Sequence, residues 1–155
     1  LLFAIVVLVT RKPVHYWLGK KSFDGKGAFF LFLQLLIVGV GLDLLARAMG
    51  VNDTQLVGVA ADNLAIIPVV GIALLAVSGI AEELFFRGIA YVFAGEGGSS
   101  LLFALFHLGY GSGVEVIGAL LAGIILARGR STYGSLFPGL AAHVLYNLVA
   151  VFVLP

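Results

Sequence analysis

Three short segments carry polar or ionisable side chains within long apolar surroundings, and each contains two motif residues one helical turn apart. They are Glu82-Glu83-x-x-x-Arg87, Phe103-x-x-x-His107 and His143-x-x-x-Asn147. A carboxylate and a histidine can share a water molecule and deprotonate it. A second histidine and an Asn amide can donate hydrogen bonds to a developing oxyanion. Together these residue types indicate a hydrolase in which water is the nucleophile.

The same side chains allow a second chemistry, because Glu and His are also zinc ligands. Catalytic zinc sites use three protein ligands and a water, and Glu82, His107 and His143 would supply that number. If His143 works with Asn147 on an oxyanion, only two protein ligands remain, and Asn is a poor zinc ligand. We therefore expect no metal cofactor, with zinc on Glu82, His107 and His143 as the alternative.

Helical spacing separates the two adjacent glutamates. Glu83 and Arg87 are four residues apart, in the order that favours an ion pair on one helix face. Glu82 points about 100° away from Glu83 around the helix, toward another partner. We therefore expect Glu83 and Arg87 to form a structural pair and Glu82 to carry the chemistry.

The elements that position these residues are expected to lie in a membrane. Hydrophobic residues make up 61% of the 155 positions and charged residues 11%, whereas a soluble domain carries about a quarter charged residues. Backbone in lipid must satisfy its own hydrogen bonds, and the apolar runs lack the alternation of a barrel. The predicted fold class is all-α, a polytopic transmembrane helical bundle with about five or six membrane helices. Ionisable residues retained inside such helices are costly and point to function.

Apolar runs separated by polar or glycine-rich stretches predict the order of the helices. Residues 1–10 are expected to end a first span. Further helices are predicted over residues 28–49, 64–93, 101–108, 114–127 and 135–153. The last four are separated by breaks at 95–100 and 109–113 and by a basic loop at 128–134. We expect a single transmembrane protease domain over residues 1–155 whose N-terminal part is missing.

Basic residues predict the topology, because Lys and Arg concentrate in cytoplasmic loops. The segments Arg11–Gly27 and Arg128–Arg130 fall on one side when the predicted helices are counted, and the loop at 50–63 has no Lys or Arg. We expect a multi-pass protein in the plasma membrane of a prokaryote. The net charge of +1 gives no reason to expect nucleic acid as a partner.

The three motifs, in this order over residues 82–147, resemble those of the CAAX protease and bacteriocin-processing family of intramembrane proteases, often called the CPBP or Abi family. The resemblance implies that Glu82 and His107 activate the water. It implies that His143 and Asn147 hold the oxyanion. It also implies that Glu83 and Arg87 shape the site.

The resemblance implies an intramembrane endopeptidase, in a family often labelled as metalloproteases. Its partners would be membrane lipid and a peptide or protein substrate, either lipidated or a peptide precursor. Two other functions stay open. A catalytically silent scaffold or bacteriocin-immunity protein would normally have lost a catalytic residue type, and none is lost here. An ion-coupled or proton-coupled transporter would also use intramembrane Glu and His, but it predicts paired repeats, which the sequence lacks.

Overall fold

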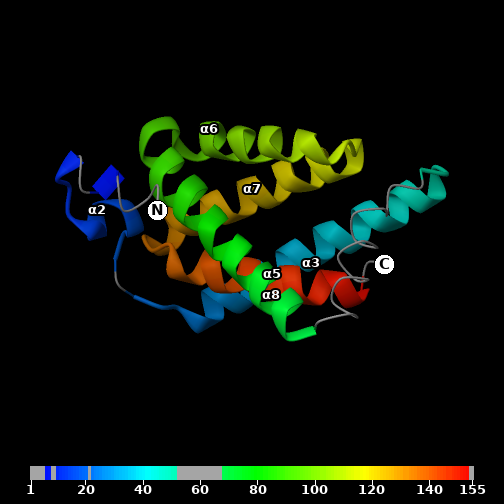
Figure 1. The fold of residues 1–155 in the computed structure, drawn as a ribbon, viewed down its shortest axis with the longest axis horizontal. Coiled ribbons are helices and arrows are strands. Elements are labelled where there is room, and N and C mark those ends of the chain that lie inside the picture. The colour runs from blue at the N-terminus through cyan, green and yellow to red at the C-terminus, as the bar shows by residue number, and fades with distance from the viewer. Residues whose placement is uncertain (1–5, 8–9, 21, 52–67, 154–155) are drawn as a thin grey trace.

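The computed structural model describes residues 6–7, 10–20, 22–51 and 68–153, and the regular elements in these ranges are helical (Figure 1). In chain order they are α2 (Val14–Leu18), α3 (Gly25–Ala48), α5 (Pro68–Glu82), the π-helix η1 (Glu83–Ala90), α6 (Tyr91–Phe106), the 3₁₀-helix η2 (His107–Tyr110), α7 (Gly113–Tyr133) and α8 (Phe137–Val153). The sole β-type pairing in these ranges is a single bridge between Gly19 and Ser135. The predicted all-α fold class is therefore confirmed. The expected first span at 1–10, the loop after residue 51 and the helix start at 64 lie largely outside the described residues.

Two helical stretches are long and apolar enough to cross a membrane. Gly25–Ala48 has a mean hydropathy of 2.3, and Pro68–Tyr110 has one of 2.0. Large apolar side chains point outward from them, such as Ile37 at 70% exposed and Val69 at 79%. Such a surface suits contact with lipid better than contact with water. The expected total of five or six membrane helices stays a prediction.

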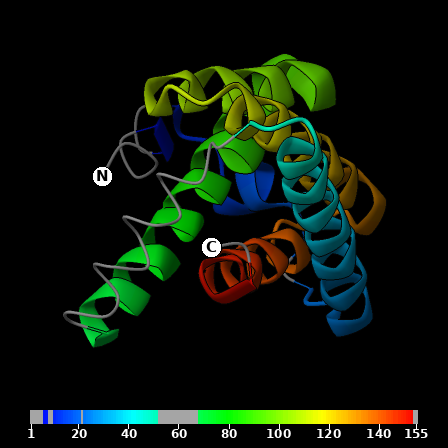
Figure 2. The ribbon, with the colours of Figure 1, turned by 90° about the vertical axis from the view of Figure 1, so that its right-hand side faces the viewer.

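Glycines let α3 and α7 pack closely in opposite directions. A Cβ atom at Gly27 would lie 2.6 Å from the Tyr133 ring, and one at Gly129 would lie 2.6 Å from the Leu31 side chain. Small residues of this kind allow helix backbones to approach where lipid supplies no hydrophobic driving force. Beside this pair, α8 lies between α3 and α5 (Figure 2). The bundle therefore places α8 where one of its faces meets α5.

The winding of the chain changes at the adjacent glutamates. The sequence predicts one α-helix over residues 64–93, but α5 ends at Glu82 and Glu83–Ala90 wind as a π-helix. Hydrogen bonds in a π-helix run from i to i+5, and such segments are rare and frequent at functional sites. Hydrophobic periodicity carries no signal for this change, so the prediction of a single α-helix was wrong here.

The predicted break at 95–100 is narrower than its glycine content suggested. Gly95 has a non-helical conformation (φ 68°, ψ −168°) and turns the chain within α6. Residues 96–100 are helical, with the Ser99 and Ser100 hydroxyls donating to the Glu96 carbonyl. The segment 101–108 is therefore no separate helix, because α6 runs through to Phe106.

The predicted basic loop after residue 127 is also helical. α7 continues to Tyr133, so Arg128 and Arg130 lie in its last turns. Cations there are favoured by the negative end of the helix dipole. The loop prediction was wrong because arginine is as compatible with a helix end as with a loop.

The two basic segments meet at one end of the bundle. Lys20 N donates to Gly134 O at 2.8 Å, and Leu136 N donates to Leu18 O at 3.0 Å. The Ser135 hydroxyl donates to a backbone carbonyl of the same N-terminal segment at 2.7 Å. The segments therefore share one end, as the charge pattern predicts. That this end faces the cytoplasm stays a prediction.

Candidate active site

Most of the candidate site lies on two antiparallel segments, which are α5 with η1 and α8. A Cβ atom at Gly79 would lie 3.2 Å from the Asn147 side-chain nitrogen, and one at Gly139 would lie 3.6 Å from Glu83 Oε2. Residue 79 therefore pairs with 147, and 83 pairs with 139. The missing side chains at the two glycines bring α5 and η1 close to α8, with His143 between the two contacts.

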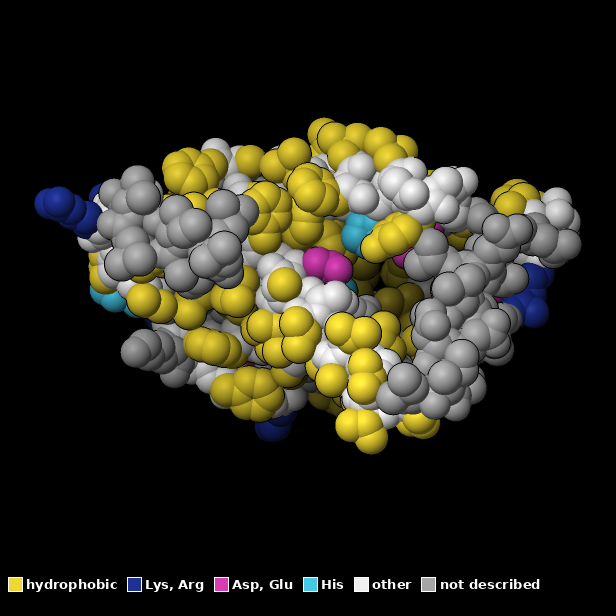
Figure 3. Space-filling view, in the orientation of Figure 1, with side chains coloured by type: hydrophobic (Ala, Val, Ile, Leu, Met, Phe, Trp, Pro, Cys, Tyr) yellow, Lys and Arg dark blue, Asp and Glu magenta, His cyan; other side chains and the backbone are white. Residues whose placement is uncertain are grey.

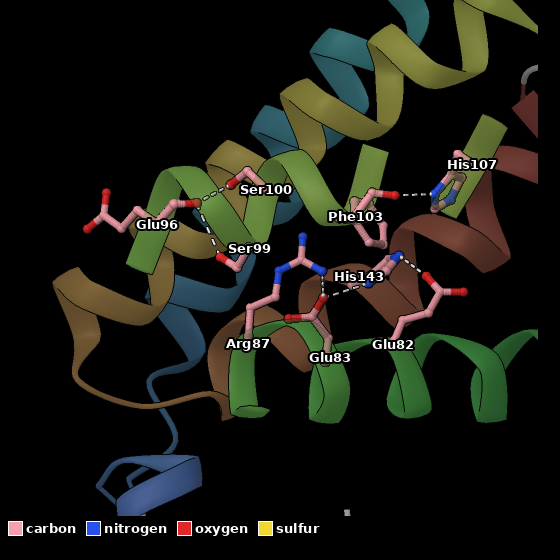
Figure 4. A network of polar contacts seen from close by, with 9 residues as sticks. All are labelled: Glu82, Glu83, Arg87, Glu96, Ser99, Ser100, Phe103, His107 and His143. Atoms are coloured by element: carbon pink, nitrogen blue, oxygen red, sulfur yellow. Dashed lines mark hydrogen bonds and ion pairs between the residues drawn. The ribbon is translucent and has the colours of Figure 1, made fainter. Parts of the chain in front are cut away.

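A buried network of three side chains joins η1 to α8 (Figure 4). Glu83 Oε1 lies 2.9 Å from Arg87 Nη1 and 2.9 Å from His143 Nδ1. The Glu83 and Arg87 side chains are each 1% exposed, and that of His143 is 6% exposed. The pair predicted from i, i+4 spacing is confirmed. The prediction did not include a second contact: the same Glu83 oxygen also lies against His143 of α8.

The second glutamate is accessible. The Glu82 side chain is 28% exposed, and its Oε2 lies 3.7 Å from His143 Nε2. Glu82 therefore lies outside the buried Glu83–Arg87 pair, as the spacing predicts. In the space-filling view, an acidic and a histidine side chain line a hollow in a mostly hydrophobic face (Figure 3). The chain thus presents an acidic group to molecules that reach this face.

The second histidine, His107, contacts the network through the Phe103 ring. The Phe103 ring lies 4.6 Å from the His107 ring and 5.8 Å from the His143 ring, measured between centroids. His107 Nδ1 lies 2.8 Å from the Phe103 carbonyl oxygen. In the described part of the chain, Asn147 forms no hydrogen bond with this network, although it faces α5 beside Gly79. The structure therefore gathers the predicted residues on α5, η1, α6, η2 and α8, with direct polar contacts only among Glu82, Glu83, Arg87 and His143.

Sequence reasoning missed three contributors to this site. Phe103 entered only as part of a motif, and Gly79 and Gly139 were not singled out. A signal was available for all three, because each lies four residues before a site residue, namely before His107, Glu83 and His143. In a helix such a residue lies on the same face as the site residue.

The ligand set of a metal site is not assembled in the described residues. No group of three or more His, Cys, Asp or Glu side chains in those ranges is arranged to hold a metal ion. The alternative set Glu82, His107 and His143 therefore lacks the three-ligand geometry of a catalytic zinc site. Metal independence itself stays a prediction.

Comparison with known families gives a match. The family model described as Type II CAAX prenyl endopeptidase Rce1-like matches residues 64–149, more than half of the chain. Neither the curated proteins nor the solved structures gave a match. The matched residues contain all three motifs, α5, η1 and most of α8, which confirms the resemblance based on the motifs. The chain belongs to the Rce1-like family of type II CAAX prenyl endopeptidases.

Proposed function

We propose that the chain is an intramembrane endopeptidase that hydrolyses a peptide bond with a water activated by Glu82 and His107. The position of His143 between two unlike glutamates carries the proposal. Buried Glu83 lies 2.9 Å from one ring nitrogen, and accessible Glu82 lies 3.7 Å from the other. One carboxylate can therefore orient the ring while the other meets substrate.

In this proposal Glu82 is the general base. It removes a proton from the water as the water oxygen forms a bond to the peptide carbonyl carbon. The carbonyl oxygen becomes an oxyanion that accepts hydrogen bonds from His143 Nε2 and the Asn147 amide. When the C–N bond breaks, Glu82 returns its proton to the leaving nitrogen. His107 orients the water through Nε2.

Glu83 and Arg87 act by positioning in this proposal. A carboxylate only accepts hydrogen bonds, so His143 Nδ1 must donate to Glu83 Oε1. Donation from Nε2 to an oxyanion then requires the doubly protonated ring, whose charge the two carboxylates would balance. Arg87 compensates the buried charge of Glu83 at 2.9 Å. A buried ion pair of this kind is costly to break on one side.

The hydrophobic face around Glu82 suggests how the substrate reaches the site and where the protein is located. Around the hollow, the face in Figure 3 is mostly hydrophobic, so the substrate would reach Glu82 from the lipid side. We propose a multi-pass protein in a prokaryotic plasma membrane, acting on a lipidated peptide or protein or on a peptide precursor. Membrane lipid would be its other partner, with no metal cofactor and no nucleic acid.

Mass spectrometry of membrane peptides from cells that express wild type or Glu82→Gln tests the proposal. Cleaved fragments should appear with wild type and be absent with Glu82→Gln. Glu96→Gln is the matched control, because the Glu96 side chain points away from the network (Figure 4). Ion flux that depends on Glu82 would instead favour the transporter. No change in either assay would favour the scaffold or immunity protein.

A further inference from the structure

The end of α6 frees one backbone carbonyl beside the site. In an α-helix the Phe103 carbonyl would accept from the backbone N–H of His107. Here the helix ends at Phe106, and that N–H turns to the carbonyls of Ala104 and Leu105. Carbonyls in the last helical turn need other donors. The His107 ring supplies one, because its Nδ1 lies 2.8 Å from the Phe103 oxygen.

This contact fixes which ring nitrogen of His107 carries hydrogen. A carbonyl oxygen only accepts hydrogen bonds, so Nδ1 must be the donor. Nε2 has no hydrogen-bond partner within the described ranges and, in the neutral ring, holds a lone pair. The partner of one ring nitrogen thus determines the function available to the other. A histidine in this form can accept a hydrogen bond from a water through Nε2.

The Phe103 side chain sets the ring planes of both His107 and His143. The Phe103 ring is 2% exposed and lies against His107 at an interplanar angle of 59°. Its contact with His143 is edge-on, at 85°. The Arg87 guanidinium carbon lies 4.3 Å from the centroid of the same ring. One buried residue therefore contacts the water-orienting histidine, the oxyanion histidine and the positioning arginine.

We propose that Phe103 is a further positioning residue of this site, holding His107 as the Nδ1–H tautomer through its carbonyl and spacing the two histidines with its ring. The catalytic consequence rests on the function proposed above for His107. The tautomer of His107 does not rest on that function, because it follows from the end of α6 at Phe106. The two parts can therefore be tested separately.

The tautomer is tested by nitrogen-15 magnetic resonance of the full chain in lipid bilayers with labelled histidine. The chain has three histidines, and a His107→Asn variant assigns the His107 signals by their loss. We expect the neutral ring to carry hydrogen on Nδ1 and none on Nε2. Hydrogen on Nε2 of neutral His107 would overturn the proposal. This measurement needs no substrate, so it stands even if the chain proves not to be a peptidase.

The role of the ring is tested by Phe103→Leu, with Phe86→Leu as the matched control. Phe86 is 3% exposed and its centroid lies 5.0 Å from that of Phe103, but its ring contacts neither histidine. Misplaced catalytic groups cost about 100-fold in rate, so Phe103→Leu should lower kcat by about that factor. KM for the peptide cleaved by wild type should change little. Equal losses of kcat in the two variants, or a rise in KM without a change in kcat, would show a merely structural role for the Phe103 ring.

Discussion

His143 Nδ1 lies 2.9 Å from Glu83 Oε1, although 60 residues separate them in the chain. The same oxygen lies 2.9 Å from Arg87 Nη1. The local ion pair of one helix is therefore the anchor for a histidine on another. The other ring nitrogen of that histidine is left facing Glu82 at 3.7 Å.

Arg87→Met should destabilise the fold more than the double variant Glu83→Gln/Arg87→Met. The single change leaves a buried carboxylate uncompensated, which costs about 3–5 kcal/mol. The double change removes both charges, so much of that cost should disappear. Unfolding in detergent of wild type, Arg87→Met, Glu83→Gln and the double variant gives the free energies of a double-mutant cycle. A double variant as unstable as Arg87→Met would contradict a stabilising pair.

Glu83→Gln alone should lower cleavage by about 100-fold, the cost of a misplaced catalytic group. The neutral amide is a weaker acceptor for His143 Nδ1, so the ring loses its orientation. Cleavage of the wild-type substrate by the purified variant measures the effect. Asp43→Asn is the control, because Asp43 pairs with Arg47 at 2.9 Å on α3, away from the site contacts. Full activity of Glu83→Gln would refute its positioning role.

Gly79→Leu should reduce cleavage by about tenfold or more, since small displacements of catalytic groups are costly. A Cβ atom there would lie 3.2 Å from the Asn147 amide nitrogen and 3.3 Å from Val144 Cγ2, so a larger side chain must push α8 away. Gly41→Leu is the control, because a Cβ atom at Gly41 meets nothing within 4 Å. Equal activity of the two variants would show that Asn147 needs no close contact with α5.

Single cysteines at Ser22 and Ser131 should be labelled from the same side of the membrane. The chain has no cysteine of its own, so each signal is unambiguous. Both positions are exposed, at the end of the bundle where the N-terminal segment contacts Gly134 and Ser135. A cysteine at Met49, just past the far end of α3, should be labelled from the opposite side. Labelling of positions 22 and 131 from opposite sides would refute the topology.

Chelators should leave cleavage unchanged, and the purified protein should contain no stoichiometric zinc. The reason is that only Glu82 and His107 remain as ligands if His143 works with Asn147, and two are fewer than a catalytic zinc needs. Elemental analysis and an assay with and without chelator measure this. Activity lost to a chelator and restored by zinc would reverse the expectation.

Several features of this protein follow from its sequence. Composition predicted the all-α fold class, and the charge pattern predicted that the basic segments share one end. The spacing of Glu83 and Arg87 predicted their ion pair. Such features depend on residue type and on distances of one helical turn, which the helix itself sets. The family followed from the same motifs, because their residue types and order are properties of the chain.

Only the tertiary structure decided how the polar residues divide between partners. No local spacing reveals that His143 contacts both glutamates or that the Phe103 ring lies between two histidines. Those contacts depend on the approach of α8 to α5, which Gly79 and Gly139 permit. The hydrophobic pattern also gave no signal for the π-helix at Glu83–Ala90. Packing between helices distant in sequence sets these distances, whereas the sequence pattern constrains only neighbours within a turn or two.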